Sequence, residues 1–263
     1  RAFQHKEVDR IPVVNIFNLN YLKKMLNLKG NIIEQFVENP IDTIVKFQED
    51  VGHDPIINIY TQQEPEQIRW PNTVFKWRDS DSSGWVVKEE IINYSEGSPT
   101  IKRIINTPRG SLQSVYRRES CQNWVMEYPL KKEEDIELLK FRPDPEKMDT
   151  SVFETFLKKL DNRAFVLIGI PSVWQEACSL RGLENILYDL YDRPEWVREL
   201  LDILMDYSVR LARKLSQTDI DCIMVNESYV GLGMSLETYE EFIWPRDKKI
   251  IEEANKGGVL TSL

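Results

Sequence analysis

A regular alternation of strand-like and helix-like segments in the second half of the chain constrains its fold more than any other feature. Residues 164–170 and 222–225 are continuous apolar runs, which are typical of parallel strands covered on both faces. Apolar residues recur at helical spacing between 194 and 215, and a second amphipathic segment runs from about 236 to 255 before a further strand-like run at 259–263. The order strand, helix, strand, helix, strand predicts parallel βαβ units and therefore an α/β fold.

The loop at 226–234 is the first place to look for function. It follows the apolar run 222–225, and in parallel βαβ units the polar chemistry gathers in the loops after the carboxyl ends of the strands. Asn226, Glu227, Ser228 and Tyr229 open this loop. The sequence therefore places an acid at the edge of the sheet where catalysis is expected.

The first half of the chain follows the same rhythm with one interruption. Residues 11–17 and 55–60 are strand candidates, and helical segments are expected near 19–28 and 31–51. Between 68 and 128, alternating stretches such as 84–88 and 100–104 lie between turn residues, which predicts antiparallel hairpins inserted into the parallel fold. A helix is expected to resume over residues 131–139.

Composition and charge exclude several classes of protein. With 41% apolar and 29% charged residues the chain has enough apolar material for a large core, and its net charge of −9 is spread through mixed segments, which argues against a nucleic-acid partner. No apolar stretch approaches the length of a membrane span, and the start lacks a hydrophobic signal core. Three widely spaced cysteines fit reduced thiols. We therefore expect a cytoplasmic protein with neither a nucleic-acid nor a membrane partner.

The two ends of the sequence suggest a longer parent chain. Residue 1 is arginine, and the glycine pair at 257–258 stops a helix just before what reads as the opening of a buried strand. We expect residues 1–263 to form a single domain that is incomplete at its C-terminus.

Four segments in order resemble the uroporphyrinogen decarboxylase superfamily. They are residues 1–13, residues 107–112 with 127–131 and 134–136, the Gly169-Ile170-Pro171 stretch leading to Gly182, and residues 235–245. The resemblance is closer to the corrinoid-dependent methyltransferase-like members than to the true decarboxylases. It implies a single (β/α)8 TIM barrel, with the hairpin region near 68–128 inserted and the last strands missing from this chain.

The decarboxylase branch of the superfamily is the alternative function. A substrate with many carboxylates requires several arginines, yet residues 15–22, where the resemblance implies an arginine-rich loop, contain none. The aspartate expected after the second strand is also missing from the sequence that begins at Asn58, and Cys178 stands where a tyrosine is expected. Ser235 matches the serine that opens a later helix. One match leaves decarboxylation as the weaker hypothesis.

The methyltransferase branch implies methyl transfer between a small methylated compound, or a thiol or folate acceptor, and a corrinoid carried by a partner protein. The resemblance implies zinc assistance, with a His-x-Cys ligand pair and a later cysteine expected beyond Leu263. It is also compatible with a homodimer. A third reading is a barrel that docks a corrinoid protein without catalysing a reaction.

The resemblance and the strand pattern together give a set of candidate site residues. Glu227 is the candidate catalytic residue, as a zinc ligand, a proton acceptor or a hydrogen-bond partner of the substrate; the alternative is a carboxylate bonded to the loop backbone. Asn226 and Tyr229 flank it as substrate-binding candidates. Trp174 and Gln175, which follow the strand at 164–170, are further candidates, although a tryptophan is more often packed than functional.

The remaining candidates have structural explanations beside functional ones. Ser235 is a candidate substrate contact, but a serine before an amphipathic run favours a helix N-cap. Cys178 and Cys222 are expected to be buried small hydrophobic residues. His53 precedes a strand, on the stability face of the fold, and His5 is expected on the surface. Neither histidine has a partner at metal-ligand spacing.

Overall fold

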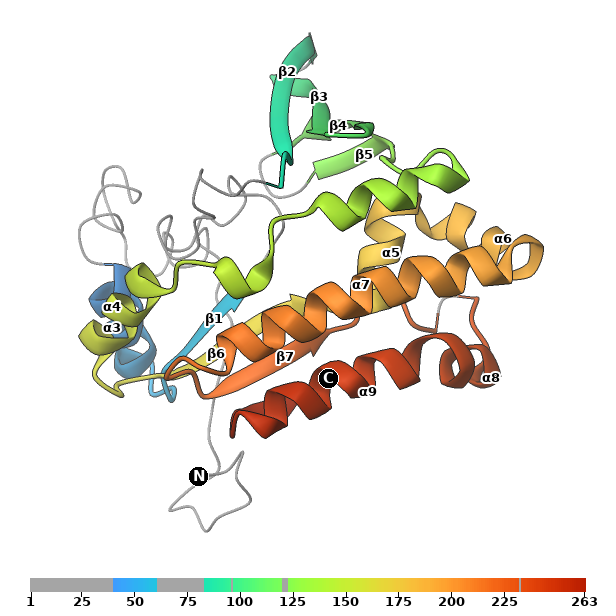
Figure 1. Cartoon of the computed structure of the whole chain (residues 1–263). Helices are drawn as coiled ribbons and strands as arrows, with labels where there is room; N and C mark the ends of the chain where they lie inside the picture. Colours follow the sequence, from blue (N-terminus) through green and yellow to red (C-terminus); the bar gives the residue numbers. More distant parts are fainter. Residues whose placement is uncertain (1–39, 61–82, 96, 120–122, 232) are drawn as a thin grey trace.

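The computed structural model describes residues 40–60, 83–95, 97–119, 123–231 and 233–263. Within these ranges the chain forms a parallel sheet flanked by helices and a separate antiparallel sheet (Figure 1). The predicted strand at 11–17 and helix at 19–28 lie outside the described residues, as do His5 and Cys121. None of the described helices is long and apolar enough to cross a membrane.

The parallel sheet confirms the predicted α/β class. Its strands are β1 (Ile56–Tyr60), β6 (Phe165–Pro171), β7 (Cys222–Asn226) and β8 (Leu260–Ser262). They pair in the order β1-β6-β7-β8, all parallel, with Ile57 opposite Val166 and Leu167 opposite Cys222. The described strands form an open sheet. Each of the three apolar runs predicted as strands in the second half of the sequence forms a strand, namely β6, β7 and β8.

Alternate residues of these strands belong to two separate apolar clusters. Ile168, Ile170, Ile223 and Val225 are fully buried in the main core, which includes the helices. The side chains on the opposite face form a smaller cluster, which consists of Ile56, Leu167 and Cys222 with the partly buried Phe165, Met224 and Leu260 packed against it. The sheet is thus apolar on both faces, as continuous apolar runs predict.

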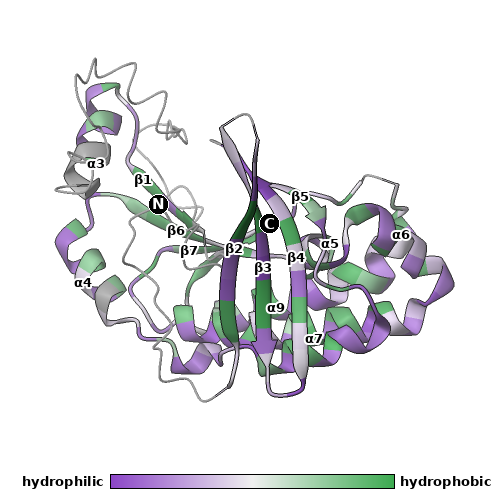
Figure 2. Cartoon of the chain, turned by 90° about the horizontal axis from the view of Figure 1, so that it is seen from above, coloured by the Kyte–Doolittle hydropathy of each residue, from purple (hydrophilic) through white to green (hydrophobic). Residues whose placement is uncertain are grey.

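Two amphipathic helices cover the main face of the parallel sheet. Helix α7 (Pro194–Leu215) begins with Pro194 in its first turn, where a missing N–H costs nothing, and buries a stripe that includes Leu200, Leu204 and Leu211. It lies beside α9 (Trp244–Lys256) along the sheet (Figure 1). Both helices carry hydrophobic as well as hydrophilic residues, as expected of amphipathic helices (Figure 2).

The helix predicted at about 236–255 is present, but a π-helical turn interrupts it. Its segments are α8 (Leu236–Thr238), the π-helical turn η4 (Tyr239–Ile243) and α9. Pro245 lies in the first turn of α9 and has no N–H to donate to a carbonyl of the preceding turn. The wider π turn accommodates that missing bond.

The antiparallel sheet confirms the predicted hairpins in the part of 68–128 that the structure describes. Its strands are β2 (Val86–Ser95), β3 (Ser98–Thr107), β4 (Gly110–Arg118) and β5 (Asn123–Glu127), paired in that order. It projects from the body formed by the parallel sheet and its helices (Figure 1). Ile101, Leu112 and Tyr116 are buried on it, whereas β2 is exposed along most of its length.

The remaining helical segments connect these parts. They are α3 (Pro40–Asp50), η2 (Glu133–Phe141), η3 (Pro145–Lys147), α4 (Ser151–Leu160), α5 (Val173–Arg181) and α6 (Leu183–Asp192). The helix expected at 131–139 is a 3-10 helix over 133–141, opened by three acidic residues. His53 lies between α3 and β1, at the amino end of that strand, where it was predicted.

Candidate functional site

Strands β6 and β7 end side by side. Pro171 is paired with Asn226, and the next amide, Ser172 N, donates to the carbonyl oxygen of Asn226 at 3.1 Å. The first turn of α5 therefore starts beside the loop that follows β7. We call this region, Ser172–Gln175 together with Asn226–Val230, the mouth.

Ser172 connects the two segments of the mouth. Its side chain is fully buried and serves as the N-cap of α5, because Oγ accepts a hydrogen bond from Gln175 N at 3.1 Å. The same hydroxyl donates to Oε2 of Glu227. One side chain thus caps a helix and binds the carboxylate that the sequence singled out.

The Glu227 carboxylate is held from both sides. Its Oε1 accepts hydrogen bonds from Tyr229 N at 2.7 Å and Val230 N at 3.1 Å, while Oε2 accepts from Ser172. The bonds from Tyr229 and Val230 are the loop-backbone arrangement that the sequence allowed as the structural alternative. The side chain is nevertheless only half-buried, so the carboxylate stays at the edge of the mouth with its orientation fixed. A catalytic role for Glu227 stays a prediction.

A second carboxyl group, that of Asp247, lies behind the mouth. Asp247 is in the first turn of α9 and is fully buried; Oδ1 accepts from Val173 N at 3.1 Å. Its Oδ2 has no hydrogen-bond partner. Burial raises the pKa of this carboxyl to about 7, and the nearby charge of Glu227 adds to the effect. Glu227 and Asp247 are thus bound to two consecutive residues, Ser172 at the N-cap of α5 and Val173 at its first position.

Sequence reasoning missed Asp247, for an identifiable reason. An acidic residue just after a proline in the first turn of a helix is an ordinary feature of helix starts. Its place beside Val173 depends on where the start of α9 lies relative to the start of α5, and no local pattern reports that arrangement. The polar character of position 247 in an amphipathic helix was the available signal.

Tyr128 and Tyr239 interact electrostatically with groups at or beside the mouth. Tyr128, directly after β5, packs its ring against Gly182: a Cβ on that glycine would lie 2.7 Å from ring carbon Cε2. Burial raises the pKa of Tyr128, and the neighbouring Tyr229 and Cys178 contribute. Tyr239 stacks on Trp244, with ring centroids 6.4 Å apart. Burial raises the pKa of Tyr239 as well, with further contributions from Asp247 and Glu227.

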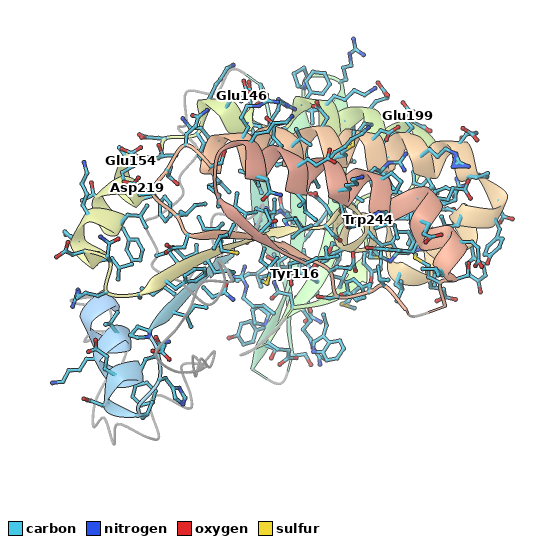
Figure 3. The ribbon with its side chains drawn as sticks, turned by 90° about the horizontal axis from the view of Figure 1, so that it is seen from below. Tyr116, Glu146, Glu154, Glu199, Asp219 and Trp244 are labelled. Carbon is cyan, nitrogen blue, oxygen red and sulfur yellow. The ribbon has the colours of Figure 1, made fainter. Side chains whose placement is uncertain are left out.

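Trp244 marks the amino end of α9 in the view with side chains (Figure 3). In the same view Glu146 and Glu199 lie on the outer, helical side of the molecule. Tyr128, which directly follows β5, packs on Gly182 at the carboxyl end of α5, and the sequence pattern did not single it out.

The structure also places the remaining residues for which a site role or burial was predicted from the sequence. Ser235 accepts a hydrogen bond from Thr238 N at 3.2 Å, which confirms the N-cap interpretation. Trp174 is fully buried in the main core, whereas Gln175 is half-buried with Oε1 unpartnered; their part in substrate binding stays a prediction. Cys178 and Cys222 are buried, as predicted.

The thiols of Cys178 and Cys222 are poor nucleophiles in this fold. Burial raises the pKa of Cys178 to about 12, with the charge of Glu227 adding to the effect. Burial likewise raises the pKa of Cys222 to about 11, and Asp221 contributes. Both thiols are therefore protonated at neutral pH.

The described residues do not by themselves form a metal site. Across these ranges no three His, Cys, Asp or Glu side chains gather closely enough to hold a metal ion. Glu227 offers carboxylate oxygens that already accept three hydrogen bonds. This donor set does not match the four ligands of tetrahedral zinc.

Two described arginines of or beside α5 are engaged in ion pairs away from the mouth. Arg142 binds Glu176 at 2.6 Å and Arg181 binds Asp189 at 2.8 Å. In the part of the chain that the structure describes, no lysine or arginine bonds to the carboxylates of Glu227 or Asp247. The mouth therefore combines carboxyl, hydroxyl and aromatic groups.

This combination defines an α/β protein with a polar site at the carboxyl ends of parallel strands. Residues 116–262 match the sequence signature of the family described as Uroporphyrinogen decarboxylase (URO-D). The match covers more than half of the chain, and the chain belongs to that family. The resemblance drawn from the four sequence segments is thereby confirmed.

A solved structure shows the same fold. It is described as "methyltransferase from Methanosarcina mazei", with a TM-score of 0.56 and 14% sequence identity. The likeness covers 99% of this chain and 66% of that protein, so this chain spans slightly less than two thirds of its length. At this identity the likeness is evidence of fold. No curated protein matches the chain.

Proposed function

We propose that the chain is part of a methyltransferase that transfers a methyl group between a small methylated compound, or a thiol or folate acceptor, and a corrinoid carried by a partner protein. Membership of the URO-D family and the methyltransferase among its structural neighbours support a methyltransferase-like role. The choice between methyl transfer and decarboxylation within the family depends on the side chains at the mouth.

The observation that carries this proposal is the absence of bonded cations at the described carboxylates. A tetrapyrrole with several carboxylates needs arginine forks to bind it. The described arginines near these elements are instead committed to ion pairs such as Arg142 with Glu176 and Arg181 with Asp189. A small methylated substrate needs no such forks.

The proposed architecture is a (β/α)8 barrel of which β1, β6, β7 and β8 form an arc. Two observations support it. The connections from β6 to β7 and from β7 to β8 pass through helices, and the longer connection from β1 to β6 includes helix α4 as well as the antiparallel sheet. The face away from α7 and α9 carries its own apolar cluster around Leu167. In a barrel the inward-facing side chains fill the interior in this way. Residues 1–263 are proposed to belong to that one domain.

In this proposal Glu227 acts on the substrate directly. Its orientation is fixed by Ser172 and two backbone amides, so the carboxylate is placed before substrate arrives. A fixed carboxylate can accept a proton from an incoming thiol or bind a polar group of the donor. Asn226 and Tyr229 are proposed as its neighbours in substrate binding.

Zinc assistance and a corrinoid partner are further parts of the proposal. The described residues do not supply a complete zinc ligand set. The roles proposed above for Glu227, Asn226 and Tyr229 therefore do not require the metal. Elemental analysis of the intact purified protein tests for zinc. Co-purification with a corrinoid protein tests for the partner.

The deciding experiment compares two reactions with the intact protein. Reduced cobalamin is incubated with the protein and a panel of methylated oxygen, nitrogen and sulfur compounds, and methylcobalamin formation is followed by absorbance. In parallel, uroporphyrinogen is incubated and its carboxylate loss is followed by mass spectrometry. We expect methylation of the corrinoid and no decarboxylation. Decarboxylation without methyl transfer would overturn the proposal, and corrinoid-protein binding without turnover would favour a docking role.

A further inference from the structure

Strand β2 lies at one edge of the antiparallel sheet and is exposed along its 10 residues, apart from the half-buried Glu89. Five of its large apolar side chains are between 36% and 66% exposed, namely Val86, Val87, Ile91, Ile92 and Tyr94. Among the described residues, no strand pairs with the outer edge of β2. A long, exposed, apolar edge strand readily pairs with another strand, and proteins usually cover or shorten such edges.

We propose that this edge is an interface between two copies of the chain, in which β2 of one copy pairs antiparallel with β2 of the other. The two four-stranded sheets would then form one continuous sheet. The antiparallel sheet projects from the body of the molecule, so its edge is accessible to a second copy (Figure 1). Because both copies use the same edge, the pairing closes as a dimer and leaves no free β2 edge.

The alternation of side chains restricts how β2 can pair with itself. Residues that lie opposite each other in neighbouring strands point to the same face of the sheet. The two-fold axis of the dimer must therefore pass through a residue of β2 and not between two residues. The regular part of β2 runs from Val86 to Ile91, where a bulge interrupts its pairing with β3. Placing the axis at Lys88 or Glu89 pairs the longest stretch of this part.

Charge and apolar complementarity select the register that is centred on Glu89. In this register Lys88 of each copy lies opposite Glu90 of the other, and Val87 lies opposite Ile91. Placing the axis at Lys88 would instead put that lysine opposite itself and Val87 opposite Glu89. Opposite charges and apolar pairs stabilise facing strands, whereas like charges destabilise them. The β2 sequence is thus complementary to itself in one register.

The two Glu89 side chains that meet at the axis are compensated within their own sheets. The Glu89 carboxylate accepts a hydrogen bond from the hydroxyl of Tyr116 at 2.5 Å and binds Arg118 at 3.2 Å. The buried guanidinium of Arg103 lies 3.6 Å from the same carboxylate. These contacts neutralise each Glu89 and reduce the repulsion between the two copies.

The opposite edge of the sheet, strand β5, does not offer the same complementarity. It has 5 residues against 10 in β2, and its central residues Trp124, Val125 and Met126 are uncharged, so no charge pair fixes a register. An interface of one strand from each copy is smaller than a standard protein interface. We therefore expect a reversible dimer with a dissociation constant in roughly the micromolar range, in which main-chain hydrogen bonds supply the affinity.

Sedimentation velocity at a series of concentrations tests the dimer with the intact protein. The wild type should change from monomer to dimer as its concentration rises through the micromolar range. Lys88→Glu places acids opposite each other and Glu90→Lys places lysines opposite each other, so each variant should weaken the dimer by about tenfold. An equimolar mixture of the two variants should associate again, because every acid then faces a lysine across the interface.

Lys158→Glu makes the same change of charge at an exposed position on α4 and should leave the dimer unchanged. A wild type that stays monomeric, a dimer unaffected by Lys88→Glu, or a mixture of the two variants that does not associate would each overturn the proposal. A dimer lost in Val125→Lys but kept in Lys88→Glu would place the interface at β5 and overturn it as well. None of these measurements depends on methyl transfer, so the dimer and the proposed function are tested separately.

Discussion

The hydroxyl of Ser172 donates a hydrogen bond to the carboxylate of Glu227, and this bond ties the carboxyl end of β6 to the loop after β7. Ser172 also caps α5 through Gln175 N. Strand end, helix start and candidate catalytic acid are therefore joined by one buried side chain. A substitution of Ser172 should therefore lower the stability of the fold and also change the position of the Glu227 carboxylate.

Ser172→Ala should lower the free energy of unfolding by about 1–2 kcal/mol, because it removes an N-cap and a hydrogen bond to a carboxylate. Urea unfolding followed by circular dichroism measures the loss. Ser235→Ala removes the N-cap of α8 at an exposed position and is the control, with a smaller expected loss. Equal losses in the two variants would contradict the linking role of Ser172.

Asp247 should make stability depend on pH. An unfolded aspartate loses its proton near 3.8, whereas the folded Asp247 carboxyl has a pKa of about 7. The folded state therefore holds one more proton between these values, and the free energy of unfolding should fall as pH rises through this window, by at most about 1.4 kcal/mol per pH unit. Above about pH 7 the loss is complete.

Asp247→Asn removes this titration while keeping an oxygen that accepts from Val173 N. Urea unfolding of both proteins at a series of pH values should show the variant gaining on the wild type from pH 4 to pH 7. Stability curves that stay parallel over that range would show that Asp247 does not titrate there.

Gly182→Ala should be more damaging than an ordinary glycine substitution. Gly182 has a φ of 89°, and a Cβ would meet the Tyr128 ring at 2.7 Å. Gly52 has a φ of 77° with open space around it, so Gly52→Ala measures the backbone strain alone, about 1–2 kcal/mol. A loss in Gly182→Ala no larger than in Gly52→Ala, by thermal unfolding, would show that Tyr128 does not rest on Gly182.

The buried pair of Arg142 and Glu176 should respond strongly to loss of one member. Both side chains are nearly inaccessible and lie 2.6 Å apart, and Arg142 also lies over the ring of Tyr207. Glu176→Gln should cost about 3–5 kcal/mol, because it leaves a buried guanidinium uncompensated. Glu127→Gln, which breaks an exposed pair with Lys131, should show little loss by urea unfolding. Similar losses in both variants would contradict the buried pairing.

Local patterns in the sequence were sufficient to predict the parallel sheet. The apolar runs that become β6 and β7 report burial on both faces, and the spacing of Leu200, Leu204 and Leu211 reports one buried face of a helix. Glu227 was found for the same reason: a residue that follows a parallel strand lies at its carboxyl end. The N-cap of Ser235 is equally local.

Other features around the mouth depend on contacts between segments that are distant in the sequence. The buried Asp247, at the start of α9, accepts a hydrogen bond from Val173 N at the start of α5. Tyr128, which follows the antiparallel sheet, rests on Gly182. Neither of these two contacts leaves a periodic pattern in the sequence. The π turn before Pro245 was also missed, because the helical pattern continues across it.

The central claim is that the carboxylate held by Ser172 serves the reaction, and the rate of methylcobalamin formation tests it most directly. Glu227→Gln keeps the shape of the side chain and should lower that rate at least tenfold at saturating methyl donor. Asp202→Asn, at an exposed position on α7 where Asp202 pairs with Arg246, should leave it unchanged. A Glu227→Gln protein that is folded and methylates the corrinoid at the wild-type rate would contradict the account.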